Sequence, residues 1–363
     1  WAREVPSARG LYHFDRIRVD FFRDRTAGFE AFKKGVVHWR EEFTSRLWAT
    51  GYDFPAVRQN KVLKREFPEE RVADMQGWAL NQRRARFRDP RVREAIELCF
   101  DFEWTNRNFF YGLYERSISP FQKSDFMATG EPAGEELALL ETFRGRIPEA
   151  AFGEPVMPPV SDGSGRDREL LAKARALLAE AGWEARDGFF HNADGERLTL
   201  EYLVRDEVFV QVTTPFIENL RAIGVDASIR MVDASQYQLR LASFDFDMVG
   251  SRLSLGATPS RDGLELVFHS GSRNLPGTED PAVDWLVEAA GRARSRKELG
   301  TTLRALDRVL RARRDWISNW HSPYHRVAHW DMFSFKEPKP DYFFPVEALW
   351  WYDEEKAKAI GRT

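Results

Sequence analysis

A predicted strand passes directly into a capped helix in the stretch Met75-Gln76-Gly77-Trp78-Ala79-Leu80-Asn81-Gln82-Arg83-Arg84 and onward through Phe87-Arg88-Asp89-Pro90-Arg91-Val92-Arg93-Glu94-Ala95-Ile96. The first half has an extended pattern as far as Asn81. Asp89 then supplies an N-cap, and Pro90 takes the first helical position, where proline is favoured. Beyond them, apolar residues recur at helical spacing and form one face. This join is one unit of an α/β pattern that continues on both sides of it.

Helices and strands alternate along much of the chain. Upstream, residues 14–24 alternate apolar and charged residues and predict a half-buried strand, followed by a helix over residues 26–34 that Gly35 ends. Downstream, residues 166–181 form the clearest helix, and residues 198–250 read as strand, helix, strand, helix and strand. Such alternation predicts a layered α/β lobe.

Less regular segments separate these elements. Residues 122–164 are rich in Gly, Pro and acidic residues, which predicts a long ordered loop with one short helix over residues 135–142. Residues 251–281 are irregular and polar, which suits a binding loop, although loops often only connect elements. Two helices follow within residues 282–314, and residues 316–330 alternate loosely. We interpret this last segment as a second crossing between two lobes, the first being the strand-to-helix join.

Length and composition allow two domains. The chain has 363 residues, and single cores usually stop growing near roughly 250–300 residues. Aromatic residues make up 13% of the chain, so flat side chains can line a cleft as well as fill a core. The formal charge of -3 argues against general nucleic-acid binding, which needs a clustered positive excess. Local runs such as Arg83-Arg84 are expected to be solvated, with anion binding as the alternative.

Cysteine usage and hydropathy exclude two further features. Cys99 is the one cysteine, so no intrachain disulfide and no cysteine-based zinc spacing exist. It falls on the apolar helix face and is expected to be a buried hydrophobic residue. No run of about 18 apolar residues predicts a membrane-spanning segment. Because the sequence opens on Trp1 without a leader pattern, we expect that a leader was removed or that a longer protein precedes it.

Three histidines form the strongest candidate for chemistry, namely His321, His325 and His329. Even spacing places all three on one face of a strand, and three imidazoles can hold zinc. However, histidines four apart on a strand lie about 13 Å apart, given a rise of roughly 3.3 Å per residue. We therefore expect no metal site and no cofactor. Neither a Gly-x-Ser-x-Gly elbow nor a phosphate-binding loop occurs. Asp245 and Asp247 are more simply a solvated pair than catalytic carboxylates.

The remaining candidates are aromatic and hydrogen-bonding residues in the crossings and the polar loop. Flat side chains and a few convergent polar groups are what a small-molecule or peptide cleft needs, and an arginine can pair a ligand carboxylate bidentately. The candidate ligand-binding residues are Trp78, Asn81, Arg83, Arg252, Ser254, Asn274, Trp320 and Tyr324.

Several of these segments together resemble the family 5 extracellular solute-binding proteins of ABC importers. The resemblance rests on residues 24–35, on Trp78-Ala79-Leu80-Asn81, on residues 89–96 and on Phe244-Asp245-Phe246-Asp247. Gly51-Tyr52-Asp53-Phe54-Pro55 and Met75-Gln76-Gly77 are most similar to the YejA-type peptide-binding branch. The resemblance implies a two-lobed α/β fold of the periplasmic-binding-protein type II kind, with the N-terminal part of lobe one missing.

The resemblance also implies where the lobes divide. Residues 1–78 and 325–363 would be the remaining part of lobe one, residues 79–84 and 319–324 the crossings, and residues 85–318 lobe two. Oligopeptide-binding members of the family hold the peptide amino group with an acidic residue after the Phe-Asp-Phe-Asp-like strand. Here Gly250-Ser251-Arg252-Leu253-Ser254-Leu255-Gly256 contains no acid, so Arg252 would instead favour an anionic group.

The leading hypothesis is therefore a periplasmic protein that captures oligopeptides or related small molecules for an inner-membrane ABC permease. We expect a monomer that is not an enzyme, uses no cofactor and binds no nucleic acid. Two other hypotheses stay open. One is an α/β metallo-hydrolase using His321 and His325, and the other is an intracellular scaffold for protein partners.

Overall fold

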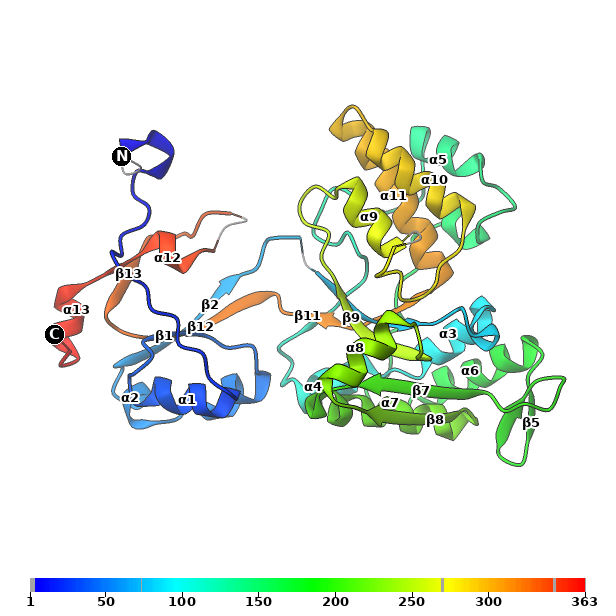
Figure 1. Cartoon of the computed structure of the whole chain (residues 1–363), viewed down its shortest axis with the longest axis horizontal. Helices are drawn as coiled ribbons and strands as arrows, with labels where there is room; N and C mark the ends of the chain where they lie inside the picture. Colours follow the sequence, from blue (N-terminus) through cyan, green and yellow to red (C-terminus); the bar gives the residue numbers. More distant parts are fainter. Residues whose placement is uncertain (1–3, 73, 269–270, 342–343, 363) are drawn as a thin grey trace. The chain divides into compact units, whose positions relative to one another are not determined.

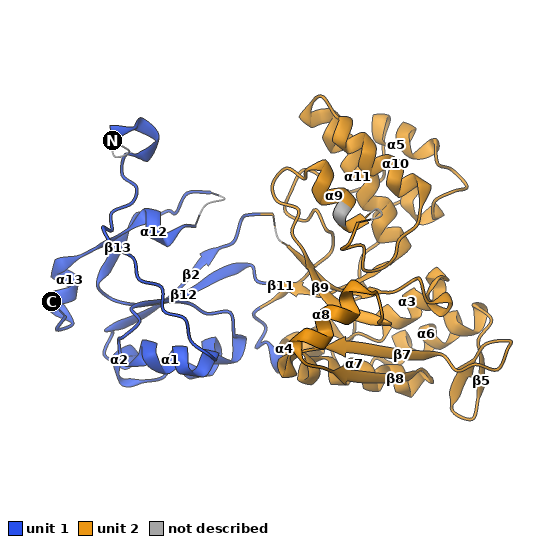
Figure 2. Ribbon diagram, viewed as in Figure 1, with its two compact units in different colours: residues 1–71, 109–113, 322–363 blue, residues 72–108, 114–321 orange. Residues whose placement is uncertain are grey.

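The computed structural model describes residues 4–72, 74–268, 271–341 and 344–362. The chain forms two compact units (Figures 1 and 2). Unit 1 comprises residues 1–71, 109–113 and 322–363, and unit 2 comprises residues 72–108 and 114–321.

The first unit boundary precedes the first predicted crossing, whereas the last boundary falls inside the second. The sequence places the crossings at residues 79–84 and 319–324, and the chain passes between the units at 71/72, 108/109, 113/114 and 321/322. The physical reason is that Met75–Leu80 pairs with strands of unit 2 on both sides. Whether the two units are the lobes of a binding protein stays a prediction.

Unit 2 is built around a five-stranded mixed sheet. The strand order is β10 (Trp316–Ser318), β3 (Met75–Leu80), β9 (Met248–Leu253), β7 (Thr199–Val204) and β8 (Asp226–Met231). β3 pairs antiparallel with both β10 and β9, while β7 pairs parallel with β8 and β9. The parallel strands are joined through α7 (Glu207–Ile223) and α8 (Ala234–Ala242), as parallel connections require.

Helices cover this sheet. On one side lie α7, α3 (Pro90–Leu98) and α6 (Arg168–Glu180) (Figure 1). The Asp89 side chain caps α3 by accepting a hydrogen bond from the Arg91 backbone N–H at 2.8 Å. The predicted cap and the predicted helix over residues 166–181 are therefore confirmed. α4 (Phe102–Phe109) follows α3, and the hairpin of β5 (Glu184–Arg186) and β6 (Phe189–His191) follows α6.

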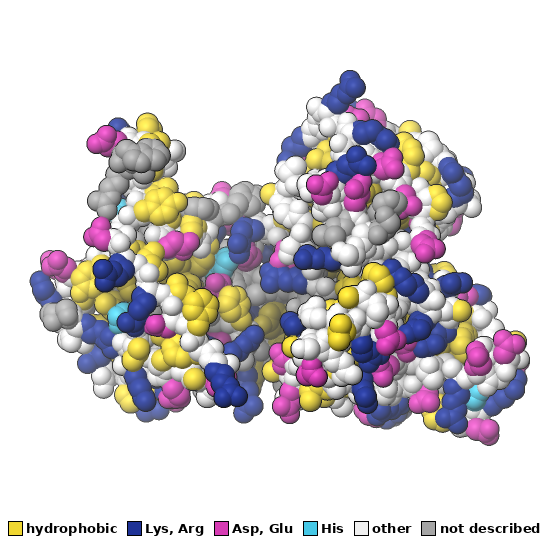
Figure 3. Space-filling model, in the orientation of Figure 1, with side chains coloured by type: hydrophobic (Ala, Val, Ile, Leu, Met, Phe, Trp, Pro, Cys, Tyr) yellow, Lys and Arg dark blue, Asp and Glu magenta, His cyan; other side chains and the backbone are white. Residues whose placement is uncertain are grey.

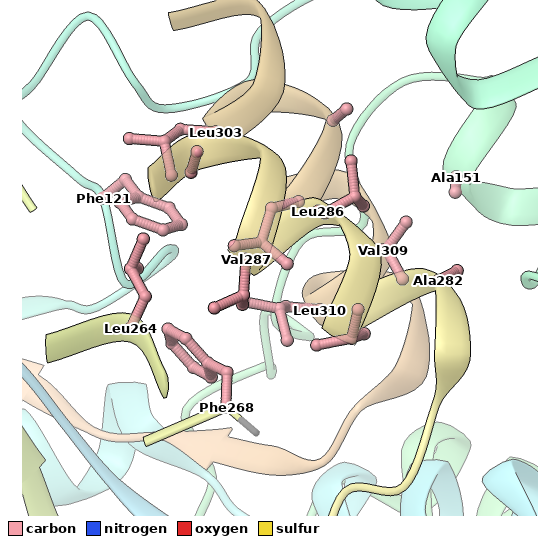
Figure 4. Packing of buried hydrophobic residues seen from close by; sticks show 14 of the residues in the cluster. Phe121, Ala151, Leu264, Phe268, Ala282, Leu286, Val287, Leu303, Val309 and Leu310 are labelled. Carbon is pink, nitrogen blue, oxygen red and sulfur yellow. The ribbon is translucent and has the colours of Figure 1, made fainter. Parts of the chain in front are cut away.

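A second group of helices forms its own core within unit 2. It consists of α5 (Gly134–Glu141), α9 (Arg261–Phe268), α10 (Pro281–Arg292) and α11 (Arg296–Arg313), with the 3₁₀ turn Glu149–Phe152. In Figure 4, side chains of α9, α10 and α11 point toward one another and toward Phe121. Met75 and Leu253 belong to the same cluster. The ends of β3 and β9 are thereby fixed against these helices.

Unit 1 contains a three-stranded antiparallel sheet in the order β1 (Trp39–Glu41), β12 (Tyr324–Trp330), β2 (Val62–Pro68). One face packs against α1 (Arg25–Lys33) through Phe29, Phe32 and Trp330. The other packs against Trp350 and its neighbours. Unit 1 also contains the 3₁₀ helix Pro6–Ala8, the π-helical turn Leu47–Gly51, α2 (Pro55–Arg58), the pair β13 (Phe333–Phe335) and β14 (Trp350–Tyr352), α12 (Val346–Leu349) and α13 (Glu354–Ala359).

The predicted strand over residues 14–24 is wrong. This segment is assigned to no strand and pairs with none in the described part of the chain. Its apolar side chains Ile17, Val19 and Phe21 are exposed. Hydrophobic side chains accordingly appear on the surface of unit 1 in Figure 3. Alternation alone did not suffice here, because a strand also needs a neighbour to pair with.

Candidate functional site

The strands β3, β9 and β10 come together at one end of the sheet of unit 2. Met75 lies opposite Leu253, and Gly77 lies opposite Ser318. A Cβ on Gly77 would approach the Ile317 carbonyl oxygen to 3.0 Å and the Trp316 ring to 3.3 Å. Glycine therefore lets β10 and the Trp316 ring lie close against β3.

A small cavity of about 50 Å³ opens at this end of the sheet. Its walls come from the strand ends, from residues 118–120 and 156–158, and from the C-terminal part of α11. The apolar lining includes Met75, Leu253, Phe268, Leu310 and Trp316. Because a water molecule takes roughly 30 Å³ of liquid volume, the cavity suits a small group rather than a whole ligand.

The charged groups lining the cavity are already paired. The Arg314 guanidinium pairs with Glu97, and the Arg311 Nε donates to the Val156 carbonyl oxygen at 2.8 Å. Burial raises the pKa of the Glu97 carboxyl, while the Arg314 guanidinium opposes that change. By contrast, the Ser318 Oγ is buried and has no hydrogen-bond partner among the described residues. The cavity thus offers apolar walls and one available hydroxyl.

Trp78 and Asn81, both predicted to face a ligand, are fully buried in unit 2. The Trp78 ring stacks on Phe216 with 5.1 Å between centroids and meets Phe100 edge-on at 4.7 Å. The Asn81 Nδ2 donates to the carbonyl oxygens of Phe244 and Phe246, at 2.9 and 2.8 Å. In this structure both side chains hold the core together.

Arg83 and Asn274 make contacts that hold part of the polar loop, residues 251–281, in place. The Arg83 guanidinium lies 3.8 Å from the centre of the Phe244 ring and donates to the Asn274 carbonyl oxygen at 3.2 Å. The Asn274 side chain is buried and exchanges hydrogen bonds with the backbone of Thr278. These contacts tie residues 274–278 to the segment that follows β3.

Arg252, Ser254, Trp320 and Tyr324 complete the predicted set. The Arg252 side chain is 70% exposed and forms an ion pair with Asp74, and Ser254 is exposed beyond the end of β9. Trp320 is largely buried and lies 6.3 Å from the Trp78 ring. Tyr324 is half-exposed and belongs to unit 1. Contact of any of these residues with a ligand stays a prediction.

The three histidines have separate surroundings. The His325 imidazole bonds Glu41 through Nδ1 at 2.7 Å and Glu69 through Nε2 at 2.8 Å. Burial opposes protonation of His325, but the bonds to the two carboxylates outweigh it and raise its pKa. Burial lowers the pKa of His329, which packs edge-on against Trp350. Across residues 4–72, 74–268, 271–341 and 344–362, no group of three or more ligating side chains is placed to hold a metal ion.

Asp245 and Asp247 are likewise engaged. Arg84 pairs with Asp245 at 2.8 Å, and Arg86 pairs with Asp247 at 2.5 Å. Asp247 also accepts a hydrogen bond from the Glu201 backbone N–H at 3.0 Å.

Among the helices that the structure describes, none is both long and apolar enough to cross a membrane.

Comparison with known proteins places this architecture in a family. A Brucella suis protein is 38% identical over 363 residues, which cover 98% of this chain and 58% of that protein. A protein of Agrobacterium fabrum described as a probable peptide-binding protein, YejA, is 36% identical over 359 residues, or 97% of this chain and 58% of its own length. The chain thus spans about three fifths of the length of these relatives.

The fold has counterparts among solved structures. The oligopeptide-binding protein AppA from Bacillus subtilis, solved with a nonapeptide, superimposes with a TM-score of 0.67 at 17% identity. The match covers 91% of this chain and 59% of AppA. The family model "Bacterial extracellular solute-binding proteins, family 5 Middle" matches residues 1–274. The chain therefore belongs to the family 5 bacterial extracellular solute-binding proteins.

Proposed function

We propose that this chain is part of the periplasmic, ligand-capturing component of an ABC importer, and that its ligands are oligopeptides or related small molecules. The observation that carries the proposal is the match of the family 5 solute-binding model to residues 1–274. The peptide-binding YejA relative and the peptide bound to AppA support it. The apolar cavity beside the end of β9, with the Ser318 hydroxyl, can take only a small group of such a ligand.

Capture requires no bond to be made or broken. A ligand shifts a conformational equilibrium only by as much as its affinities for the two states differ. The inner-membrane permease would recognise the ligand-bound state. Of the predicted residues in unit 2, Arg252 and Ser254 are the most accessible, so we propose them as ligand contacts.

Ligand-dependent stabilisation tests this function. A peptide at 100 times its dissociation constant should stabilise the chain by about 2.7 kcal/mol. Thermal unfolding is measured with a mixture of tri- to pentapeptides and, as the control, with the same amino acids in free form. Mass spectrometry should recover every peptide intact. Stabilisation by free amino acids alone, or cleavage of the peptides, would contradict the proposal.

A further inference from the structure

One face of the unit 2 sheet forms the floor of the small cavity. Side chains alternate between the two faces of a strand, and directly opposed residues share a face. Met75 and Gly77 of β3 therefore lie on the same face as Trp316 and Ser318 of β10. Met75, Trp316 and Ser318 all line the cavity. Gly77 lies directly opposite Ser318 and adds no side chain, so it leaves room beside the Ser318 hydroxyl.

Helices and a loop close the cavity above this floor. Phe268 of α9 and Leu310 of α11 supply apolar walls (Figure 4). Residues 118–120 form another wall. They are held in place because β4 (Glu115–Arg116), which precedes them, pairs antiparallel with β11 (Trp320–His321), which follows β10. The walls thus come from well-anchored elements of a single unit.

Two serine hydroxyls line the cavity, and they differ in their bonding. The Ser119 Oγ donates to the Asp307 carboxylate at 2.7 Å and accepts from the Phe121 backbone N–H at 2.9 Å. Ser318 is 5% exposed, and its Oγ has no hydrogen-bond partner among the described residues. Buried polar atoms are nearly always hydrogen-bonded. The Ser318 hydroxyl is therefore available to a polar group of a bound molecule.

The volume of the cavity limits the size of that group. An engineered cavity of about 150 Å³ in another protein holds benzene, or about 25 Å³ for each ring carbon. The cavity of about 50 Å³ therefore holds about two heavy atoms. Valine and threonine have that many heavy atoms beyond Cβ, whereas leucine has one more. The charged groups lining the cavity are already paired, so a neutral group is favoured. Threonine combines the fitting size with a hydroxyl.

We propose that this cavity selects a threonine side chain of a bound peptide, with the methyl group against the apolar walls and the hydroxyl bonded to the Ser318 hydroxyl. The inference rests on the proposed function and deepens it. Each hydroxyl can donate or accept, so the bond forms in either direction. Valine fits the same space but leaves the Ser318 Oγ without a partner, and leucine is too large. The chain therefore prefers peptides with threonine at one position.

Analogues of tetraalanine test the inference. Each analogue carries threonine, valine or leucine at one position, every position is tried in turn, and calorimetry measures the affinity for the wild-type chain. At one position, threonine should bind about fivefold tighter than valine, the factor for one net hydrogen bond, and leucine should bind more weakly than valine. In Ser318→Ala, the advantage of threonine over valine should disappear. A general loss of folding would weaken both peptides alike and leave their ratio unchanged.

The control is Ser117→Ala. Ser117 is also buried with an Oγ that has no partner in the described part of the chain, but the walls of the cavity come from other residues. The preference for threonine should therefore persist in this variant. If Ser318→Ala does not fold, the comparison of threonine, valine and leucine on the wild-type chain decides the matter.

Three results would overturn the inference alone. Peptides could bind without preferring threonine to valine at any position, leucine could bind as tightly as threonine at the preferred position, or folded Ser318→Ala could keep the preference. Failure of the wild-type chain to bind any peptide would overturn the proposed function and the inference with it.

Discussion

The two sheets of this protein are stabilised by different physical means. In unit 2, the interior strand β3 carries Trp78, Ala79 and Leu80, all with 0% exposure, and packs through apolar and aromatic contacts. The central strand of unit 1, β12, carries His325 and His329 on one face, and an imidazole joins two carboxylates there. The stabilisation that apolar burial provides does not depend on pH, whereas the stabilisation from an imidazole between two carboxylates does. We expect the two units to respond differently to substitution and to pH.

The largest effect should come from Trp78→Ala. Sequence analysis alone predicts weaker ligand binding without unfolding. The structure instead places the ring against Phe216 and Phe100, so we expect unit 2 to lose about 3–5 kcal/mol of stability. Urea unfolding followed by pulse proteolysis, with fragments identified by mass spectrometry, measures each unit separately. Trp78→Phe is the milder control. An unchanged midpoint for unit 2 would mean that the indole is not part of its core.

Raising the pH should weaken unit 1 selectively. Hydrogen bonds to Glu41 and Glu69 raise the pKa of His325 above its ordinary value near 6.5, so the stabilisation is complete below that value and is lost as pH rises through the folded-state pKa. A neutral imidazole has one N–H and can donate to only one carboxylate. The loss should be about 1.5–3 kcal/mol, the strength of a hydrogen bond to a charged group.

The measurement is urea unfolding of unit 1 at pH 6 and pH 9. His325→Gln should remove most of the difference between the two pH values, while unit 2 changes little in either protein. At acidic pH, the stability of unit 1 depends instead on Glu69. Burial raises the pKa of Glu69, but hydrogen bonds from Arg71 and His325 outweigh it and hold the pKa below its ordinary value. This contribution is present above the ordinary value and is lost as the pH falls through the lowered folded-state pKa. An identical pH dependence in His325→Gln would refute the assignment.

Asn81→Ala should destabilise unit 2 by about 1–3 kcal/mol, because it removes the donor of two backbone carbonyl oxygens. These are the buried carbonyl of Phe246 and the partly buried carbonyl of Phe244. The matched control is Asn108→Ala on the exposed face of α4, which should change stability by less than about 0.5 kcal/mol. Equal effects of the two substitutions would show that Asn81 contributes nothing beyond its surface area.

The sequence predicts local structure such as helices and their caps, but it does not predict which strands pair. The cap at Asp89 and the helix α6 follow from neighbouring residues, and both are confirmed. The segment 14–24 has a strand pattern without a partner strand, which no local pattern reveals. Residue type favours Trp78, Asn81 and Asn274 as ligand contacts. The sequence does not show that the two asparagine side chains already bond backbone carbonyls, or that the Trp78 ring already stacks on another ring.

The smallest effect on stability should come from Arg252→Ala. The Arg252–Asp74 pair lies at the surface, with the Arg252 side chain 70% exposed, and exposed ion pairs contribute about 0–1 kcal/mol. Any effect of Arg252→Ala on ligand binding can therefore be measured without a large loss of stability, unlike that of Trp78→Ala. If Arg252 contacts the ligand, Arg252→Ala should weaken binding of tetraalanine more than that of its C-terminal amide, because the amide carries no carboxylate. Arg230→Ala, at an exposed position of the edge strand β8 of the same sheet, is the control. Equal losses for acid and amide would mean that Arg252 positions Asp74 and reads no charge on the ligand.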